Sequence, residues 1–529
     1  MTAVSTKPAP HLTTANWRPS LNPWLIAVSV MLCTFMEVLD TSIANVALPH
    51  IAGSLSITPD EATWVLTSYL ISNAIILPTT GWFSRTFGRK RFLLVCIGIF
   101  TIGSLACGVA PNIQTLIIAR VIQGAGGGAL QPSAQAILLE SFPPAKRGQA
   151  MAFYTFGIIF APIIGPTLGG WITDSATWRW VFYINVPVGV VAAMMVVSFI
   201  EDPPYIRNAA KTTLDYIGFA LLAIWLSCLQ VVLDKGQEAD WFGALYIRWL
   251  VAAAAITFLA FVIWELTAEH PVVNLRALRN RNFAAGTAIV LAIGMVLYGT
   301  TALLPLFLQT LLNYPALQSG LAVSPRGFGS IVAILIVGRI VNWFDTRIFI
   351  VAGLALLSWS SFALGRVNLD IGMLSVTWPI IVNGFAVSML FIPLSVTTMS
   401  TLRNDQIGNA TGIYNLMRNI GGAIGISITT TLLARHSQWV QNMLVGNVST
   451  TNANFHQNVA AITTALPRQS SPAAATHLTY GIIYQQLQQQ AQAMAYVHDF
   501  RLLGFMCLAC IPLVLLLRSP KVMRKVAVH

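Results

Sequence analysis

Fourteen apolar stretches follow one another along the chain of 529 residues, each about as long as a helix that crosses a membrane. Such a helix needs about 20 predominantly apolar residues. The stretches cover residues 24–47, 62–81, 92–110, 113–135, 150–171, 178–199, 214–233, 245–267, 283–309, 317–341, 347–365, 371–397, 409–433 and 499–518. This pattern predicts an all-α polytopic membrane protein. A membrane β-barrel would instead show alternation in segments of roughly 10 residues.

The composition supports the same class. Only 9% of the residues are charged and 56% are hydrophobic, whereas a soluble domain is about 25% charged. A soluble enzyme, a disordered chain and a coiled coil are therefore excluded. The net charge of +12 does not favour nucleic-acid binding, because Lys and Arg gather in the short segments between apolar stretches. The six cysteines all fall within apolar stretches, where packing is the usual role.

The positions of Lys and Arg predict the orientation. If the N-terminus is inside, nineteen of them fall on inner loops and tails and four on outer loops. Cytoplasmic loops carry such an excess. We therefore expect a multi-pass membrane protein with both termini cytoplasmic.

Two six-helix bundles are predicted from a weak internal repeat. A glycine-led basic segment follows the second stretch at Gly81–Arg91, and a similar segment follows the tenth at Gly338–Arg347. Repeated halves with a binding site between them are typical of transporters. The expected organisation is a tail (1–23), an N-terminal bundle (24–200), a linker with two extra spans (201–282), a C-terminal bundle (283–518) and a second tail (519–529).

The segment 434–498 is the one long outer loop. It is nearly uncharged and rich in Gln, Asn, Ala and Thr, and 485–492 reads as a helix. A solvated linker would explain the composition. We favour a docking surface for another protein, because long loops in compact proteins are often functional.

Two acids lie inside a predicted span. Of eighteen Asp and Glu residues, sixteen, Asp215 and Glu265 among them, fall in loops or near the ends of stretches. Glu37 and Asp40 lie three residues apart on the first stretch and so share a helix face. Because ionisable groups in a membrane are costly, they are functional candidates by default. Removal from water favours the neutral, protonated carboxyl group, so these acids could carry a proton, or one could be a structural ion-pair partner.

Arg120 is the only charge in the fourth stretch. It should find an acid across the bundle or line a wet cavity, and Glu37 or Asp40 would suit. A purely structural ion pair is the alternative. Polar and aromatic residues at comparable depth could line a substrate cavity, although packing explains each one alone. They are Tyr69, Asn73, Gln123, Gln131, Gln135, Tyr298, Gln309, Tyr414, Asn415 and Arg418. The tenth stretch adds Arg326 and Arg339.

The fifth stretch carries small residues at four-residue spacing, with two prolines between them. They are Gly157, Ala161, Pro162, Gly165, Pro166, Gly169 and Gly170. Small residues at this spacing let helices approach closely, and proline weakens the helical hydrogen bonds. We interpret the stripe as tight packing and as a bendable seam for gating.

Five segments together resemble the major facilitator superfamily, in its fourteen-helix drug:proton antiporter branch (the EmrB/QacA family). The segments are Leu39–Pro49, Gly81–Arg91, Arg120–Gly128, Ala161–Gly170 and Trp178–Pro187. Ala161 replaces the first glycine of the antiporter motif G-x-x-x-G-P-x-x-G-G. The loop motif is carried by Gly81, Arg85, Gly88, Arg89 and Lys90. Arg85 stands where the family has Asp, so Arg89 and Lys90 are expected to pair with inner-face acids or helix C-termini.

The resemblance implies a major facilitator fold and a proton-coupled efflux antiporter. The likeness is greatest to the inner-membrane members of tripartite pumps, and it implies a place in the bacterial inner membrane. It also implies a periplasmic adaptor (EmrA-like) that docks on 434–498 and an outer-membrane channel (TolC-like). From the residues, two acids against three or four membrane arginines favour export of neutral or weakly acidic lipophilic compounds. No catalytic residues, metal site or cofactor are expected. An uncoupled or specific metabolite or siderophore exporter, and a non-transporting membrane sensor, remain alternatives.

Overall fold

The computed structural model describes residues 19–143, 146–203, 215–341, 344–369, 371–446, 448, 453–465 and 472–518. The C-terminal tail 519–529, most of the N-terminal tail 1–23 and residues 204–214 of the 201–282 linker lie outside this part of the chain. All fourteen predicted stretches fall on helices. Within these described ranges, twelve helical segments are long and apolar enough to cross a membrane by themselves.

The N-terminal half packs as one group of helices. These are α1 (Pro23–Leu55), α2 (Pro59–Phe87), α3 (Arg89–Val109), α4 (Ile113–Gly127), α5 (Leu130–Ser141), α6 (Arg147–Ser175), α7 (Trp180–Tyr183) and α8 (Asn185–Phe199). Thr58 caps α2 in a capping box with Glu61, which satisfies backbone N–H groups of the first turn. Gly88, at φ +87°, allows the tight turn from α2 into α3.

The predicted stretch 113–135 is not one helix. It divides between α4 and α5, and α5 continues to Ser141. Glycines explain the close packing at this division: a Cβ on Gly124 would lie 2.5 Å from the carbonyl oxygen of Tyr69, and one on Gly128 would lie 2.4 Å from that of Asn73. The glycine-rich segment therefore lets α4 and α5 rest directly on the backbone of α2.

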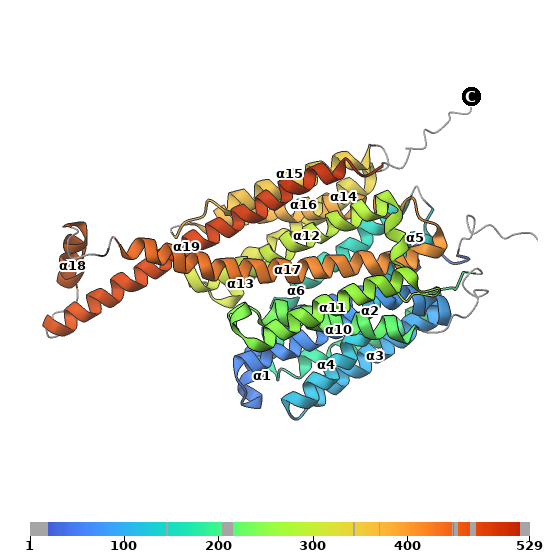
Figure 1. Cartoon of the computed structure of the whole chain (residues 1–529), viewed down its shortest axis with the longest axis horizontal. Coiled ribbons are helices and arrows are strands. Elements are labelled where there is room, and N and C mark those ends of the chain that lie inside the picture. Colours follow the sequence, from blue (N-terminus) through green and yellow to red (C-terminus); the bar gives the residue numbers. More distant parts are fainter. Residues whose placement is uncertain are drawn as a thin grey trace, which may run out of the picture.

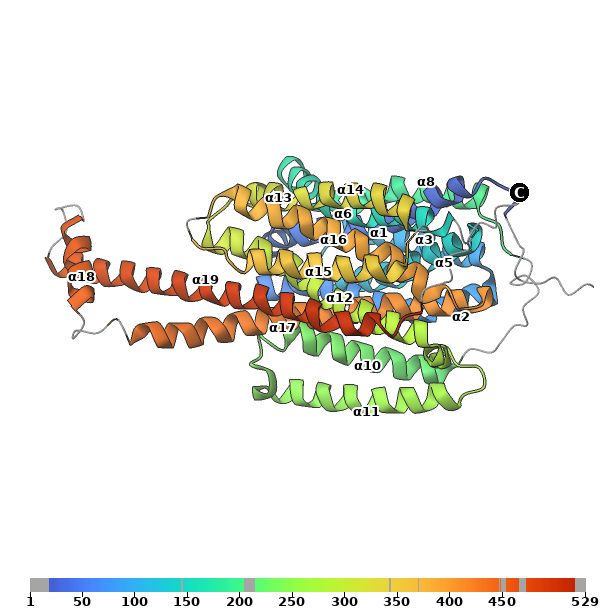
Figure 2. The ribbon, with the colours of Figure 1, turned by 90° about the horizontal axis from the view of Figure 1, so that it is seen from above.

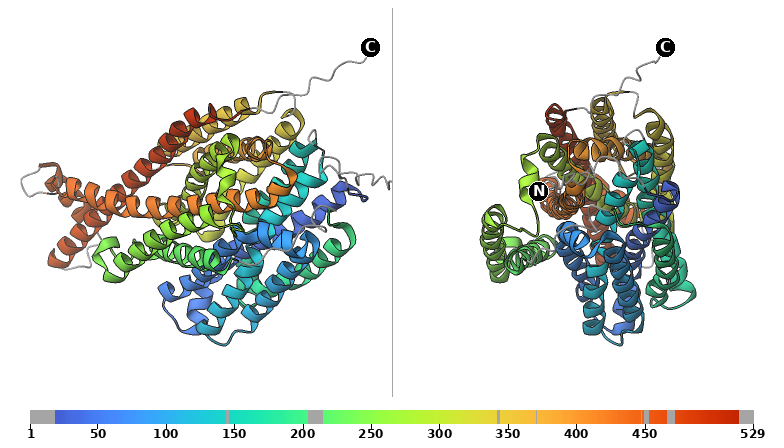
Figure 3. Two further views of the ribbon diagram at one scale, coloured as in Figure 1. Left: turned by 45° about the vertical axis from the view of Figure 1, so that its right-hand side comes forward. Right: turned by 90° about the vertical axis from the view of Figure 1, so that its right-hand side faces the viewer.

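The C-terminal half begins after two helices that lie at the edge of the bundle. These two are α10 (Tyr216–Lys235) and α11 (Leu245–Thr267), accompanied by the short 3-10 helices η3 (Trp241–Gly243) and η4 (Leu275–Arg279). Figure 2 shows α10 and α11 along one side of the bundle, and the end-on view of Figure 3 shows them in green beside it. In the described chain α11 packs mainly on α10.

The remaining helices complete the bundle. They are α12 (Arg281–Leu306), the π-helical turn η5 (Phe307–Leu311), α13 (Ala316–Val323), α14 (Pro325–Ile340), α15 (Thr346–Leu364), α16 (Met373–Met399), α17 (Asn404–Val445), α18 (Ala453–Ala465) and α19 (Pro472–Val514). The stretch 409–433 lies within the 42-residue α17.

The predicted loop 434–498 is largely helical where it is described, which corrects the sequence-based expectation. Helix α17 continues to Val445, and α19 begins at Pro472, well before the predicted span at 499. Figures 1 and 2 show α17 and α19 extending side by side past one end of the bundle, with α18 at the tip. Gln441 of α17 donates a hydrogen bond to the hydroxyl of Tyr484 of α19 (3.3 Å). We call residues 434–498 the helical extension.

The glycine stripe of α6 faces α1. A Cβ on Gly157 would meet Met31, one on Gly165 would lie 2.2 Å from the Ser42 hydroxyl, and one on Gly169 would meet Ile43. Ala161 is buried between them, and Pro162 and Pro166 lie inside the helix. These contacts bring α1, which carries both membrane acids, against α6 along most of its length.

The two repeat segments make equivalent contacts between the halves. Gly81 of α2 lies against Asn409 of α17, where a Cβ would come within 2.6 Å of the backbone, and Gly338 of α14 lies against Ala152 of α6. Each glycine thus marks a point where a helix of one half crosses a helix of the other.

Candidate functional site

Asp40 is the centre of a buried polar cluster inside the N-terminal half. It is 0% exposed and forms an ion pair with Arg120, whose Nη1 lies 2.7 Å from its Oδ2. Gln123 and Asn185 donate to its other oxygen at 2.8 and 2.7 Å. Because both oxygens are hydrogen-bonded and a cation is adjacent, the cluster stabilises an ionised Asp40.

Arg120 is held from several sides. Its Nε donates to the carbonyl oxygen of Val65 and its Nη1 also donates to Gln123 Oε1. Its guanidinium carbon lies 4.2 Å from the ring centre of Tyr69. These contacts fix the ion pair between α1 and α4, and they place Tyr69 and Gln123 in this cluster rather than on a cavity wall.

Glu37 lies one turn away in a different environment. It is 5% exposed and accepts hydrogen bonds from the amides of Asn73 on α2 and Gln131 on α5. None of the ion pairs recorded for the described residues includes it. The two amide donors favour the charged carboxylate, but no cation contacts it directly, so burial disfavours the charge of Glu37 more than that of Asp40.

Gln131 connects this acid to the other half of the protein. Its side-chain oxygen accepts a hydrogen bond from the guanidinium of Arg418 on α17. Four residues further along α5, Gln135 accepts one from Asn415 of α17 at 2.8 Å. A chain of contacts thus runs from Glu37 through Gln131 to Arg418, across the boundary between the halves.

The halves are closed at the end of the bundle where α2 ends and α17 begins. Gly81 touches Asn409, and a Cβ on Gly412 would lie 2.7 Å from the carbonyl oxygen of Leu77. Together with the two glutamine contacts deeper in the bundle, these approaches leave the backbones of α2 and α17 in direct contact. The structure therefore represents one state of a two-half arrangement, closed on this side.

The basic loop after α2 is anchored to the N-terminal half. The buried Arg89 forms an ion pair with Glu140 at the end of α5. The Lys90 amide donates to Asp202 (2.9 Å) and its ammonium to the carbonyl oxygen of Val197 (2.5 Å), near the C-terminus of α8. Arg85, by contrast, is exposed. Arg89 and Lys90 thus have the kinds of partner that the sequence indicated.

Other predicted cavity residues lie in several places. Tyr414 is buried, and its hydroxyl has no recorded partner. Tyr298 packs on Gly422, and Gln309, in η5, donates weakly to Ser319 (3.4 Å). These three residues are not in contact with the Glu37 and Asp40 clusters, so the structure does not gather the whole predicted set around one centre.

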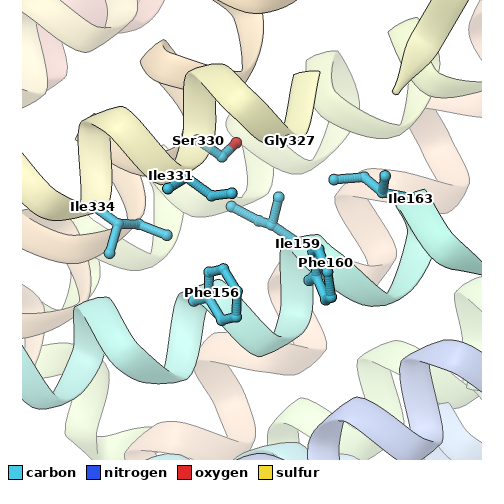
Figure 4. Close-up of a pocket in the computed structure, with 8 residues that line it drawn as sticks. All are labelled: Phe156, Ile159, Phe160, Ile163, Gly327, Ser330, Ile331 and Ile334. Carbon is cyan, nitrogen blue, oxygen red and sulfur yellow. The ribbon is translucent and has the colours of Figure 1, made fainter. Parts of the chain in front are cut away.

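A narrow apolar pocket lies between the halves where α6 packs on α14 (Figure 4), with about 160 Å³ of non-atom space that includes open solvent. Phe156, Ile159, Phe160 and Ile163 line it from α6, and Gly327, Ser330, Ile331 and Ile334 line it from α14. Ser330 is the one polar side chain among them, and its hydroxyl donates to the carbonyl oxygen of Gly384. The cavity therefore offers apolar surface only.

Sequence reasoning missed several buried polar groups. Asn185 was not singled out although it donates to Asp40. Glu140, Glu265 and Asp499 were assigned to loops or ends of stretches, yet all three are buried. Glu265 accepts from the Val273 amide and Asp499 contacts His436. The segment after α11 folds back over Glu265, whereas Glu140 and Asp499 contact residues far away in the chain. The periodicity of the sequence does not indicate either kind of contact. No group of three or more metal-ligating side chains occurs within the described residues.

Two bundled halves, a buried ion pair and polar contacts between the halves define a membrane transporter. Residues 30–426 match the family model of the Major Facilitator Superfamily, and the chain belongs to this family. Among solved structures, the proton:xylose symporter XylE has a TM-score of 0.61 at 15% identity, covering 93% of this chain and 94% of its own. The human organic anion transporter MFSD10 has a TM-score of 0.60 at 13% identity, covering 92% and 100%.

Relatives found by sequence comparison share a much higher sequence identity with the chain than these solved structures do. The fatty acid resistance protein FarB of Neisseria gonorrhoeae is 34% identical over 94% of this chain and 96% of its own length. The multidrug export protein EmrB of Haemophilus influenzae is 39% identical over 77% of this chain and 79% of its own. EmrB of Escherichia coli K12 is 36% identical over 81% and 84%. The chain is thus a multi-pass transporter similar to bacterial export proteins.

Proposed function

We propose that this protein is a proton-coupled multidrug efflux antiporter that exports lipophilic, neutral or weakly acidic compounds by alternating access. The observation that carries the proposal is the pair of buried carboxyl groups on α1. Asp40 is neutralised by Arg120, whereas Glu37 accepts only amide hydrogen bonds and connects through Gln131 to the other half. The similarity to EmrB and FarB supports export as the direction of transport.

Each group has a distinct part in the proposed cycle. In the closed state Glu37 is protonated, since burying a neutral carboxyl group costs less free energy than burying a charged one. Loss of the proton would place a second negative charge one turn from Asp40 and would favour rearrangement of Arg418 and Gln131 at the boundary. Protonation and the contact between the halves would then change together, as coupled transport requires.

The apolar cavity along α6 and α14 supports the lipophilic part of the proposal. Transferring apolar surface out of water contributes roughly 25 cal/mol per Å² to the free energy of binding. Aromatic and aliphatic walls therefore favour lipophilic compounds in general and do not select one of them. The small residues and prolines of the α6 motif would let this seam open and close. The predicted cavity residues Asn73, Gln131, Tyr414, Asn415 and Arg418 would border the space that opens.

The helical extension supports an adaptor partner. Trp439, Met443 and Tyr484 expose apolar or aromatic surface there, each with more than half of its accessible area. Exposed apolar side chains beyond the membrane-spanning part mark protein contacts more often than lipid contacts. We propose that this surface faces the periplasm and docks an EmrA-like adaptor leading to a TolC-like channel, with both termini in the cytoplasm of a Gram-negative cell.

Proton flux in proteoliposomes tests the proposal. Addition of a lipophilic drug to wild-type vesicles should drive measurable proton movement in the opposite direction. Asp40→Asn and Glu37→Gln should each abolish this movement. Downhill drug exchange should persist in Glu37→Gln, which keeps a side chain of the same shape. Drug export by the wild type with no proton movement would contradict the proposal and favour an uncoupled exporter.

A further inference from the structure

A second cavity lies within the C-terminal half, away from the carboxyl groups of α1. Its volume is about 260 Å³, and it is lined from α12, α14, α15 and α16 and from Val323 at the end of α13. The lining residues are Thr300, Thr301, Leu304, Val323, Arg326, Leu364, Ile380 and Asn383. Four of these side chains are apolar and four are polar, so the cavity has an apolar wall and a polar wall.

The polar wall has unused hydrogen-bonding capacity. Arg326 Nη1 donates to the hydroxyl of Thr301 at 2.7 Å, but its Nη2 is buried without a partner. Asn383 is 2% exposed, and neither its amide nitrogen nor its oxygen has a partner. Buried polar atoms are nearly always hydrogen-bonded. Three unsatisfied atoms on one small cavity therefore point to something that binds there.

The charge of Arg326 is also uncompensated. In the part of the chain that the structure describes, no recorded ion pair includes this residue. This contrasts with Arg120 and Arg89, which each contact a carboxylate. Arg326 is half-buried, and withdrawing a cation even partly from water without a counter-charge is costly, so a negatively charged ligand would lower that cost.

The backbone holds the cavity wall in place. A Cβ on Gly329 would lie 1.9 Å from the carbonyl oxygen of Ile381, and one on Gly384 would lie 1.9 Å from that of Arg326. Helices α14 and α16 are therefore in backbone contact on both sides of Asn383. Such close packing fixes the position of the Arg326 backbone relative to the Asn383 amide, which suits a preformed site.

We propose that this cavity binds the carboxylate headgroup of a singly charged amphiphile, with Arg326 and Asn383 as the donors. Arginine binds carboxylates through charge-assisted, often bidentate, hydrogen bonds, and the amide supplies one more donor. Leu304, Leu364 and Ile380 would contact the first methylenes. The space between the lining side chains is narrow, so it can take at most a headgroup and leaves the tail outside. The inference deepens the proposed function by assigning weak acids a site of their own.

Binding measured apart from transport tests the inference. Purified wild-type protein in detergent should bind decanoate at least about tenfold more tightly than 1-decanol, by isothermal titration calorimetry. Arg326→Gln should abolish this preference, and Asn383→Leu should reduce it. Arg339→Gln is the matched control, since Arg339 lies on the same helix but is exposed, and it should keep the wild-type preference.

Arg326→Lys guards against misfolding, because it keeps the charge but loses the planar pair of donors. It should bind decanoate more weakly than the wild type and still prefer it to 1-decanol. Equal affinity of the wild type for both compounds, or an unchanged preference in Arg326→Gln, would overturn the inference. Proton-driven export of a neutral drug by the wild-type protein tests the proposed function separately, because such a drug does not need the headgroup site. If the wild type does not export the neutral drug in exchange for protons, the proposed function is refuted. The binding data still decide whether the headgroup site exists.

Discussion

Arg418, on the C-terminal half, donates a hydrogen bond to Gln131, on the N-terminal half. The same glutamine donates to Glu37. The side chain of Gln131 therefore contacts both Glu37 and the C-terminal half, which is a direct physical route from protonation to conformational change. A two-state element biased by a local charge change is what coupling of this kind requires.

Replacement of Gln131 by Leu should uncouple these events. Leucine keeps similar bulk but can neither donate to Glu37 nor accept from Arg418, so the closed state loses its link across the boundary. Spin labels at Phe87 and Thr401, both exposed near the closed end, should report a wider and more open distance distribution than in the wild type. A distribution that is unchanged at every pH tested would contradict this role.

Asp40→Asn should destabilise the folded protein as well as stop proton-driven export. The substitution leaves the guanidinium of Arg120 buried without its counter-charge, and breaking a buried pair in this way costs about 3–5 kcal/mol. Thermal unfolding in detergent should show a lower Tm. The double variant Asp40→Asn with Arg120→Gln should regain much of the Tm but not the export, which separates stability from coupling.

Gly81→Ala should push the halves apart at the closed end. The new Cβ would lie 2.6 Å from the Cα of Asn409, a backbone atom that cannot rotate away. We expect at least a tenfold loss of export rate, measured in vesicles at equal protein density. Gly98→Ala, on α3, is the control, because nothing lies within 4 Å of a Cβ there. Equal rates for the two variants would argue against a moving contact at Gly81.

The basic loop offers a contrast between two arginines four residues apart. Arg89→Ala removes one side of the buried ion pair with Glu140 and should lower stability by about 3–5 kcal/mol. Arg85→Ala removes an exposed side chain and should change stability by no more than about 0.5 kcal/mol. Chemical unfolding curves for the two variants test this, and similar losses in both would show that the loop does not depend on the buried pair.

The helical extension should be needed for the partner and not for transport. Trp439→Ser combined with Met443→Ser removes two exposed apolar side chains beyond the membrane-spanning part. Capture of a purified EmrA-like adaptor should weaken at least tenfold, while drug-driven proton movement in vesicles stays at the wild-type level. Trp171→Ser, at another exposed tryptophan, should leave capture intact. Loss of proton movement in the double variant would instead indicate a structural role.

Several features followed from the chain alone because they are local or compositional. Apolar stretches of spanning length predicted every membrane helix, since the bilayer sets that length. Glu37, Asp40 and Arg120 stood out because charges are rare in such stretches. The small residues of α6 indicated a close helix contact, although not which helix it meets.

The partners of these residues were decided only by the tertiary structure. The sequence left Arg120 a choice between Glu37 and Asp40, and packing of α4 on α2 and α3 brought its side chain to Asp40. Asn185, Glu140 and Asp499 became part of buried clusters through contacts between segments far apart in the chain. A hydrogen bond depends on distance and angle in space, and hydrophobic periodicity records only which face of a helix avoids water. That is why composition and spacing identified the membrane charges, and folding alone determined what each one touches.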